Sequence, residues 1–151
     1  MGIGGAADAE KMHRMWTAFA RECLALGATV DEVQRRAWEP HYVYVLHVPE
    51  QRLFKVGYTR HDSRRLKDLT ARGRAVIVQQ HWVANQWAAR VLEGVVMERT
   101  AAARRTSAAS SAHGKTEHWD DATAPPELAA IAAELECDPK LRYWAISSYP
   151  T

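Results

Sequence analysis

The chain has 151 residues, of which 47% are hydrophobic and 25% are charged. This composition is typical of one globular domain, and it excludes a long repeat array and a largely disordered chain. No apolar run is long enough to cross a membrane, the first residues lack a secretory pattern, and the two cysteines stand outside any metal-binding or disulfide spacing. We therefore expect a cytoplasmic protein that has no membrane partner.

The net charge of +2 conceals an uneven distribution along the chain. Residues 51–75 contain eight Lys and Arg residues against two aspartates, which gives this segment a charge of +6. Residues 116–137 contain six acidic residues and no Lys or Arg, which gives a charge of −6. The pattern predicts that phosphate is attracted to the first segment and not to the second.

The first 40 residues favour helix. From residue 7 to residue 26, apolar side chains recur at three- and four-residue spacing, which predicts one amphipathic helix that Gly27 ends. The stripe that we expect to be buried consists of Met12, Met15, Trp16, Phe19, Cys23 and Leu26. Thr29 and Glu32 form a capping box for a short second helix. We interpret residues 1–40 as a helical extension that covers the core, in preference to a DNA-reading element.

The pattern then changes to strands. Residues 42–48 are β-branched and aromatic, residues 53–58 repeat this character after a turn, and the two runs predict a hairpin. A helix capped by Asp62 or Ser63 follows and ends at Gly73, and residues 75–82 form a third predicted strand.

The second half of the chain is mostly helical. Asn85 is the predicted cap of a long helix that runs towards Arg104, and a further helix follows two prolines and reaches Leu135. Residues 141–147 predict a short strand or an extended cover. The expected fold is α+β, a small three-stranded antiparallel sheet flanked by helices, with segments 1–40 (helical extension), 41–122 (central domain) and 123–151 (C-terminal helix and cover).

Two residues stand out against their predicted surroundings. Gly57 lies in the interior of a strand, where a bulge, a close helix contact or the approach of a phosphodiester would account for it. Glu93 lies in the most apolar turn of its helix, where a buried carboxylate needs a cation. That cation is either Arg90, three residues earlier, or a divalent metal whose other ligands are mainly water.

Four short motifs follow one another along the predicted elements: Tyr42-Val43-Tyr44, Lys55-Val56-Gly57, Arg65-Leu66 and Glu93. In order and spacing they resemble the GIY-YIG nuclease superfamily, over roughly residues 42–119. The second motif and the block Gly114 to Trp119 are most similar to the phage-type branch, in which the second motif reads Lys-Ile-Gly. The resemblance implies hydrolysis of a DNA phosphodiester at one divalent metal, Mg²⁺ or Mn²⁺.

The resemblance also implies a role for each matching residue. Tyr44 would help to deprotonate the attacking water, although it would equally serve as a core aromatic. Arg65 would steady the phosphate with its planar guanidinium, and Glu93 would bind the metal. The neighbouring Arg64 is better explained by a surface salt bridge to Asp68, four residues later.

The sequence departs from the family at two positions. Lys55 replaces a tyrosine, and it would act either as a base of lowered pKa or as a phosphate contact. Leu69 replaces a histidine four residues after the arginine, and His61 or His118 would take its place. The remaining substrate contacts expected from this pattern are Gly57, Arg60, Arg64 and Lys115.

Three functions follow from these observations. The first is a metal-dependent endonuclease that acts through Tyr44, Lys55, Arg65 and Glu93. The second is a catalytically silent DNA-binding module, which the two departures favour, and the third is an enzyme of the same fold with a non-nucleic-acid substrate. DNA is the expected partner, and a homodimer or a second protein would supply specificity.

Overall fold

The structure, a computed structural model, describes residues 5–27, 36–104 and 118–147. Four antiparallel strands form one sheet in the order β3-β1-β2-β4. The strands are β1 (His41–Val48), β2 (Leu53–Arg60), β3 (Val76–Val83) and β4 (His118–Asp120). The helices are α1 (Gly5–Leu26), α2 (Arg65–Thr70), α3 (Gln86–Arg99) and α4 (Leu128–Glu136). The expected α+β class is confirmed.

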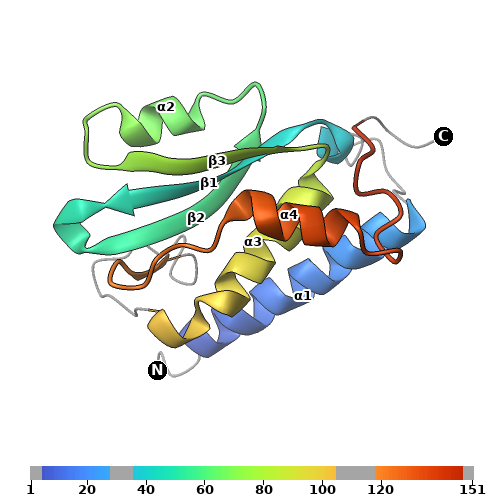
Figure 1. The fold of residues 1–151 in the computed structure, drawn as a ribbon, viewed down its shortest axis with the longest axis horizontal. Coiled ribbons are helices and arrows are strands. Elements are labelled where there is room, and N and C mark those ends of the chain that lie inside the picture. Colours follow the sequence, from blue (N-terminus) through green and yellow to red (C-terminus); the bar gives the residue numbers. More distant parts are fainter. Residues whose placement is uncertain (1–4, 28–35, 105–117, 148–151) are drawn as a thin grey trace.

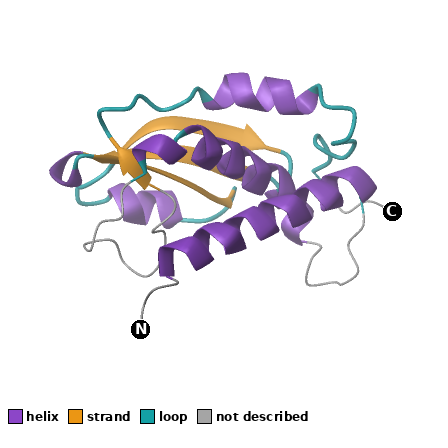
Figure 2. Cartoon of the chain, turned by 90° about the horizontal axis from the view of Figure 1, so that it is seen from below, coloured by secondary structure: helices purple, strands orange, loops and turns teal. Residues whose placement is uncertain are grey.

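The sheet divides the molecule into two unequal layers. Helix α2 covers one face, whereas α3 and α4 cover the other, and α1 packs on the outside of α3 (Figures 1 and 2). Successive side chains of β1 point to opposite faces of the sheet. Val43 and Val45 lie in the large core with α3, whereas Tyr44 and Leu46 lie in a small core with α2. The face on which a strand residue lies therefore decides which helices it meets.

The fourth strand corrects the expected three-stranded sheet. Strand β4 has only three residues and pairs with the first part of β2, where Trp119 lies opposite Phe54 with ring centroids 5.8 Å apart. Trp119 is fully buried in the large core. So short a segment, placed in an acidic stretch, carries no period-two pattern that a sequence analysis could detect.

The buried stripe predicted for α1 is wrong. Of its members only Cys23 is buried, while the other five are 39–67% exposed: Met12, Met15, Trp16, Phe19 and Leu26. The helix docks instead through smaller residues such as Thr17 and Ala20. A Cβ atom on Gly94 of α3 would lie 2.7 Å from the Thr17 side chain, so this glycine lets the two helices approach closely.

The helix ends largely follow the sequence. Gly27 and Gly73, the two predicted stops, have positive φ angles of 64° and 68°. The Asn85 side chain caps α3 by accepting a hydrogen bond from the backbone N–H of Ala88 at 2.8 Å, as predicted. Helix α3 nevertheless ends at Arg99, and a short 3-10 turn (η3, Ala101–Ala103) follows it.

The C-terminal segment 141–147 forms turns in place of the predicted strand or extended cover. Asn85 binds this segment to the start of α3, because its Nδ2 donates to the carbonyl oxygens of Tyr143, Trp144 and Ile146 at 2.8–3.3 Å. The predicted helix after Thr29 falls mainly on residues 28–35, outside the described part. None of the described helices is both long and apolar enough to cross a membrane.

Candidate nucleic-acid interface

The first two motif strands meet at Tyr44 and Gly57, which are direct cross-strand partners. The Tyr44 ring lies flat over the glycine, since a Cβ atom on Gly57 would stand 2.5 Å from the phenolic oxygen. The register of β1 on β2 is unbroken here, so the glycine marks a close side-chain contact and no bulge. Tyr44 is 1% exposed and belongs to the small core, which makes it a packing residue whatever further role it has.

Lys55 and His118 share the face of Tyr44. Lys55 pairs with Leu46 on one side and with His118 of β4 on the other, and paired residues of antiparallel strands point to the same face. Lys55 is half-buried and His118 is 4% exposed. Three of the residues singled out from the sequence, Tyr44, Lys55 and His118, thus share one face of the sheet with Gly57.

Helix α2 covers this face with its apolar side. Leu66 and Leu69 pack on the small core, so the leucine at the family's histidine position is a packing residue. The predicted cap at Asp62 or Ser63 is wrong, because Arg64 is the N-cap residue and forms no side-chain cap hydrogen bond; the Ser63 hydroxyl, one residue earlier, accepts a hydrogen bond from the backbone N–H of Arg65 at 3.1 Å. With its leucines turned inward, the short helix leaves Arg65 and Lys67 exposed.

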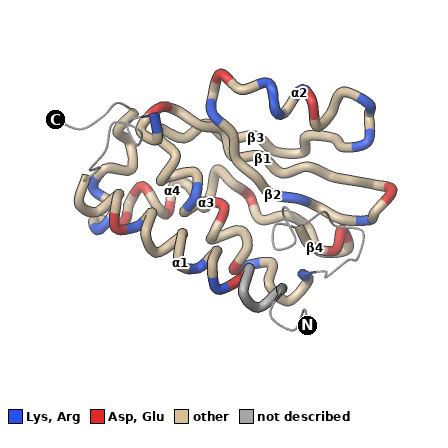
Figure 3. Tube along the Cα trace, turned by 180° about the vertical axis from the view of Figure 1, so that it is seen from behind, with Lys and Arg blue, Asp and Glu red and all other residues tan. Residues whose placement is uncertain are grey.

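Lys and Arg positions cluster along α2 and the loops at its two ends, with Asp62 and Asp68 among them (Figure 3). We call the exposed set Arg64, Arg65, Lys67, Arg72 and Arg74 the basic face. None of these five forms an ion pair within the described residues. The predicted salt bridge between Arg64 and Asp68 is therefore wrong, and Arg64 instead precedes the first turn of the helix.

Arg60 lies at the end of β2, beside the basic face. Its Nε donates to Asp62 at 2.7 Å, and this hydrogen bond holds the pKa of the Asp62 carboxyl below its usual value. The following residue, His61, is exposed and donates its backbone N–H to the carbonyl of Pro40 at 3.0 Å. Lys115, the last predicted contact, lies outside the described residues.

Glu93 does not join these residues. It lies in the middle of α3, on the other side of the sheet, 5% exposed and with its Oε1 3.9 Å from Nε2 of His13 in α1. The Arg90 guanidinium lies over the rings of Trp16 and Tyr58, at 5.3 and 5.5 Å.

The position of Glu93 bears on the metal that the family resemblance implies. A single-metal hydrolytic site requires its carboxylate to reach the phosphate held by the basic residues. The sheet stands between Glu93 and Arg65, and the described residues include no group of three or more acidic, His or Cys side chains that could hold a metal. The described residues therefore do not fit that metal site.

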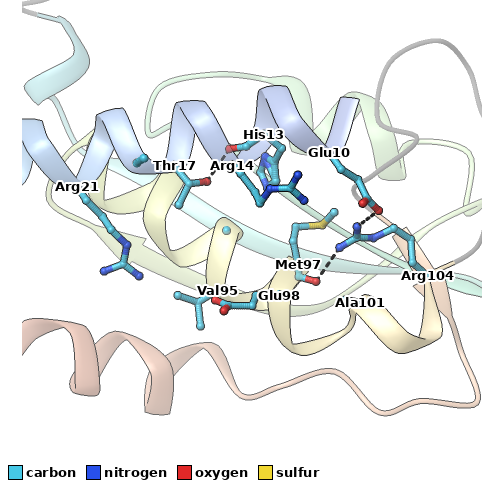
Figure 4. A pocket seen from close by; sticks show the side chains of 12 residues that line it. Glu10, His13, Arg14, Thr17, Arg21, Val95, Met97, Glu98, Ala101 and Arg104 are labelled. Atoms are coloured by element: carbon cyan, nitrogen blue, oxygen red, sulfur yellow. Dashed lines mark hydrogen bonds and ion pairs between the residues drawn. The ribbon is translucent and has the colours of Figure 1, made fainter. Parts of the chain in front are cut away.

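A cavity of about 380 Å³ lies on the helical side, between α1 and α3 (Figure 4). Its charged groups are of both signs, and Arg104 is already held by Glu10 and by the carbonyl of Met97. It contains none of the motif residues. We therefore do not place phosphate binding there.

A smaller cleft of about 270 Å³, which no sequence pattern indicated, lies between α2 and the sheet. Its lining includes Arg60, His61 and Lys67, together with the polar Thr59 and Gln80. The alternation of side chains along β3 indicates which of them face the cleft, but only once the register of β3 on β1 is known.

The buried His41 and the partly buried His13 are expected to make the stability of the protein depend on pH. Burial lowers the pKa of His41 and of His13, and in His13 the nearby Arg90, Arg104 and Arg14 add to this effect. The unfolded chain therefore takes up protons first as the pH falls below about 6.5. We expect the free energy of unfolding to decrease from pH 7 towards pH 5, by at most about 1.4 kcal/mol per pH unit for each histidine.

Urea denaturation at a series of pH values measures this slope. In His41→Asn, whose amide can replace the hydrogen bond of 2.7 Å to the carbonyl of Glu39, the slope should become shallower. The matched control is His61→Gln, at an exposed histidine, which should keep the full slope. A wild-type stability that does not change between pH 7 and pH 5 would contradict the burial argument.

Comparison with known proteins adds no relative to this description. No family model, no curated protein and no solved structure matches the chain.

Proposed function

We propose that the protein binds DNA through the phosphate backbone, and that the basic face is the contact surface. The observation that supports this proposal is the set of five exposed Lys and Arg side chains on and beside α2 with no ion-pair partner in the described residues. Cations left without internal partners are available to replace the counterions of a polyanion.

The rest of the surface favours the same location. Helix α4 and the segment before it carry the negative charge of residues 116–137, so DNA would be repelled there. Arg64 and Arg65 stand on a helix whose inner side is fixed by two leucines, which keeps their backbone positions constant. Backbone binding of this kind needs no fixed base sequence.

Hydrolysis of the bound phosphodiester is the second candidate function. It is favoured by Lys55, which lies half-buried on the same side of the sheet as the basic face, with His118 directly across the strand. Arg65 would stabilise charge on the phosphate with its two parallel N–H groups, and Lys55 would donate a hydrogen bond to the leaving oxygen. A dependence on Mg²⁺ or Mn²⁺ stays a prediction of the family resemblance.

Two measurements test the two functions separately. Fluorescence anisotropy with a labelled duplex, repeated at several salt concentrations, should give an affinity that falls steeply as salt increases. Binding that does not respond to salt, or no binding at low salt, would contradict the proposed contact surface. Supercoiled plasmid incubated with Mg²⁺, Mn²⁺ or EDTA reports hydrolysis.

For the hydrolysis assay we expect Lys55→Ala to abolish cleavage and to leave duplex affinity within a few fold. The control is Lys140→Ala, an exposed lysine after α4, which should cleave as the wild type does. Intact plasmid under every condition, together with salt-dependent binding, would identify the protein as a binding module without activity. Normal cleavage by Glu93→Ala is the result that the position of Glu93, across the sheet from the basic face, predicts.

A further inference from the structure

The cleft between α2 and the sheet opens beside the basic face. It has a volume of about 270 Å³, and its lining residues include Tyr42, Thr59 and Gln80 as well as the apolar Leu66 and Ile77. Arg60 and Lys67 line the same cleft and place positive charge beside it. The volume is slightly below the range of about 300–1,000 Å³ of ordinary ligand sites, which suits one flat ring system.

An exposed aromatic side chain stands next to this cleft. Trp82 of β3 is 50% exposed, although tryptophan is among the residues most often buried. In the register of β3 on β1, Trp82 pairs with Tyr42. The next pair on the same face of the sheet is Gln80 with Tyr44. Cross-strand partners share a face, so Trp82 lies on the α2 side beside Tyr42.

We propose that the cleft between α2 and the sheet, with Tyr42 in its wall and the cross-strand partner Trp82 beside it, accepts an unpaired base of the DNA whose backbone lies on the basic face. This inference rests on the proposed function and names its substrate class, which is DNA with a bulged, mismatched or single-stranded nucleotide. The juxtaposition that carries it is a half-exposed tryptophan beside a cleft of mixed apolar and polar lining that includes Lys67 and the Asp62-paired Arg60.

The chemistry of the cleft matches the parts of a nucleotide. Aromatic side chains stack on bases irrespective of sequence, since every base has a π face. The Gln80 amide both donates and accepts hydrogen bonds and the Thr59 hydroxyl does the same, as the edge of a base requires. Arg60 and Lys67 belong to the lining of the same cleft, so their side chains would face the phosphates that flank a base bound there.

A base stacked inside a duplex cannot enter so narrow a cleft without leaving the helix. A base that is already unpaired avoids the cost of a few kcal/mol of unpairing and unstacking. The structure therefore predicts a preference for DNA with an unpaired base over a perfect duplex of equal charge.

The test compares two DNA molecules that differ in a single base. Both are the same short duplex with one extra nucleotide in the middle of one strand, and in one of them this nucleotide is abasic. The phosphate charge is identical, so the affinity ratio measured by anisotropy reports the base alone. We expect the DNA with the base to bind about tenfold more tightly, and Trp82→Ala to reduce this ratio to about one.

Trp16→Ala is the matched control, because Trp16 is 47% exposed and lies on α1, away from the cleft. It should leave both affinities and their ratio unchanged. A wild-type ratio of one, or a ratio that survives in Trp82→Ala, would overturn the proposed base site while leaving backbone binding intact. If neither DNA binds the wild type at low salt, the proposed function fails together with the inference.

Discussion

Replacing Arg64, Arg65 and Lys67 together by glutamine is expected to weaken duplex binding by about two orders of magnitude at low salt. Each lost phosphate contact removes the release of about one counterion, so the slope of log K against log [salt] should become shallower by about 0.9 for each contact. All three side chains are exposed and lack ion pairs in the described residues, so the fold should tolerate the change.

The matched control removes the same three charges elsewhere. Lys11, Lys140 and Arg142 are also exposed, and they lie on α1 and after α4. Replacing these three by glutamine should change the affinity by less than about threefold, since only the long-range field is altered. Equal losses in the two triple variants would show that net charge, and no particular surface, determines binding.

Gly57→Ala is expected to destabilise the protein by about 2 kcal/mol or more, because the new methyl group has no room. It would stand 2.5 Å from the phenolic oxygen of Tyr44 and 2.7 Å from Cζ, and the ring is held by Leu66 and Leu69 from above. Overpacking of a closed site typically costs 1–3 kcal/mol. The shift in the urea midpoint, at unchanged m value, measures it.

A double variant shows whether the clash is the cause. Tyr44→Leu alone removes ring contacts and destabilises the protein, but combined with Gly57→Ala it also removes the atoms that the methyl group meets. The double variant should therefore lose less stability than the sum of the two single variants. A strictly additive result would mean that the alanine is accommodated without the ring and that the close contact has no energetic consequence.

The elements with strong local signals could be predicted from the sequence. The hairpin follows from two β-branched runs joined by a turn, and the long helix α3 follows from its cap at Asn85 and its apolar period. Gly27 and Gly73 end their helices because a left-handed residue is required there. These features are local, so a single segment contains the information that determines them.

The errors arise where a long-range contact decides the outcome. The apolar period of α1 predicted burial of Trp16 and Phe19. In the structure α1 instead packs the small Thr17 closely against Gly94 of α3, and both rings stay 39–47% exposed. The family resemblance equally placed Glu93 with Arg65, and only the packing of α3 and α2 on opposite faces of the sheet shows that they lie apart. The exposed stripe on α1 offers an apolar surface for the expected homodimer, which stays a prediction.

The central claim concerns where DNA lies on the protein, and an NMR titration of ¹⁵N-labelled protein with a short duplex tests it most directly. We expect the amide signals of residues 60–74 to shift as DNA is added, and those of α4 (Leu128–Glu136) to stay in place. Shifts confined to α1 or α4, with the signals of residues 60–74 unchanged, would contradict the basic face as the nucleic-acid interface.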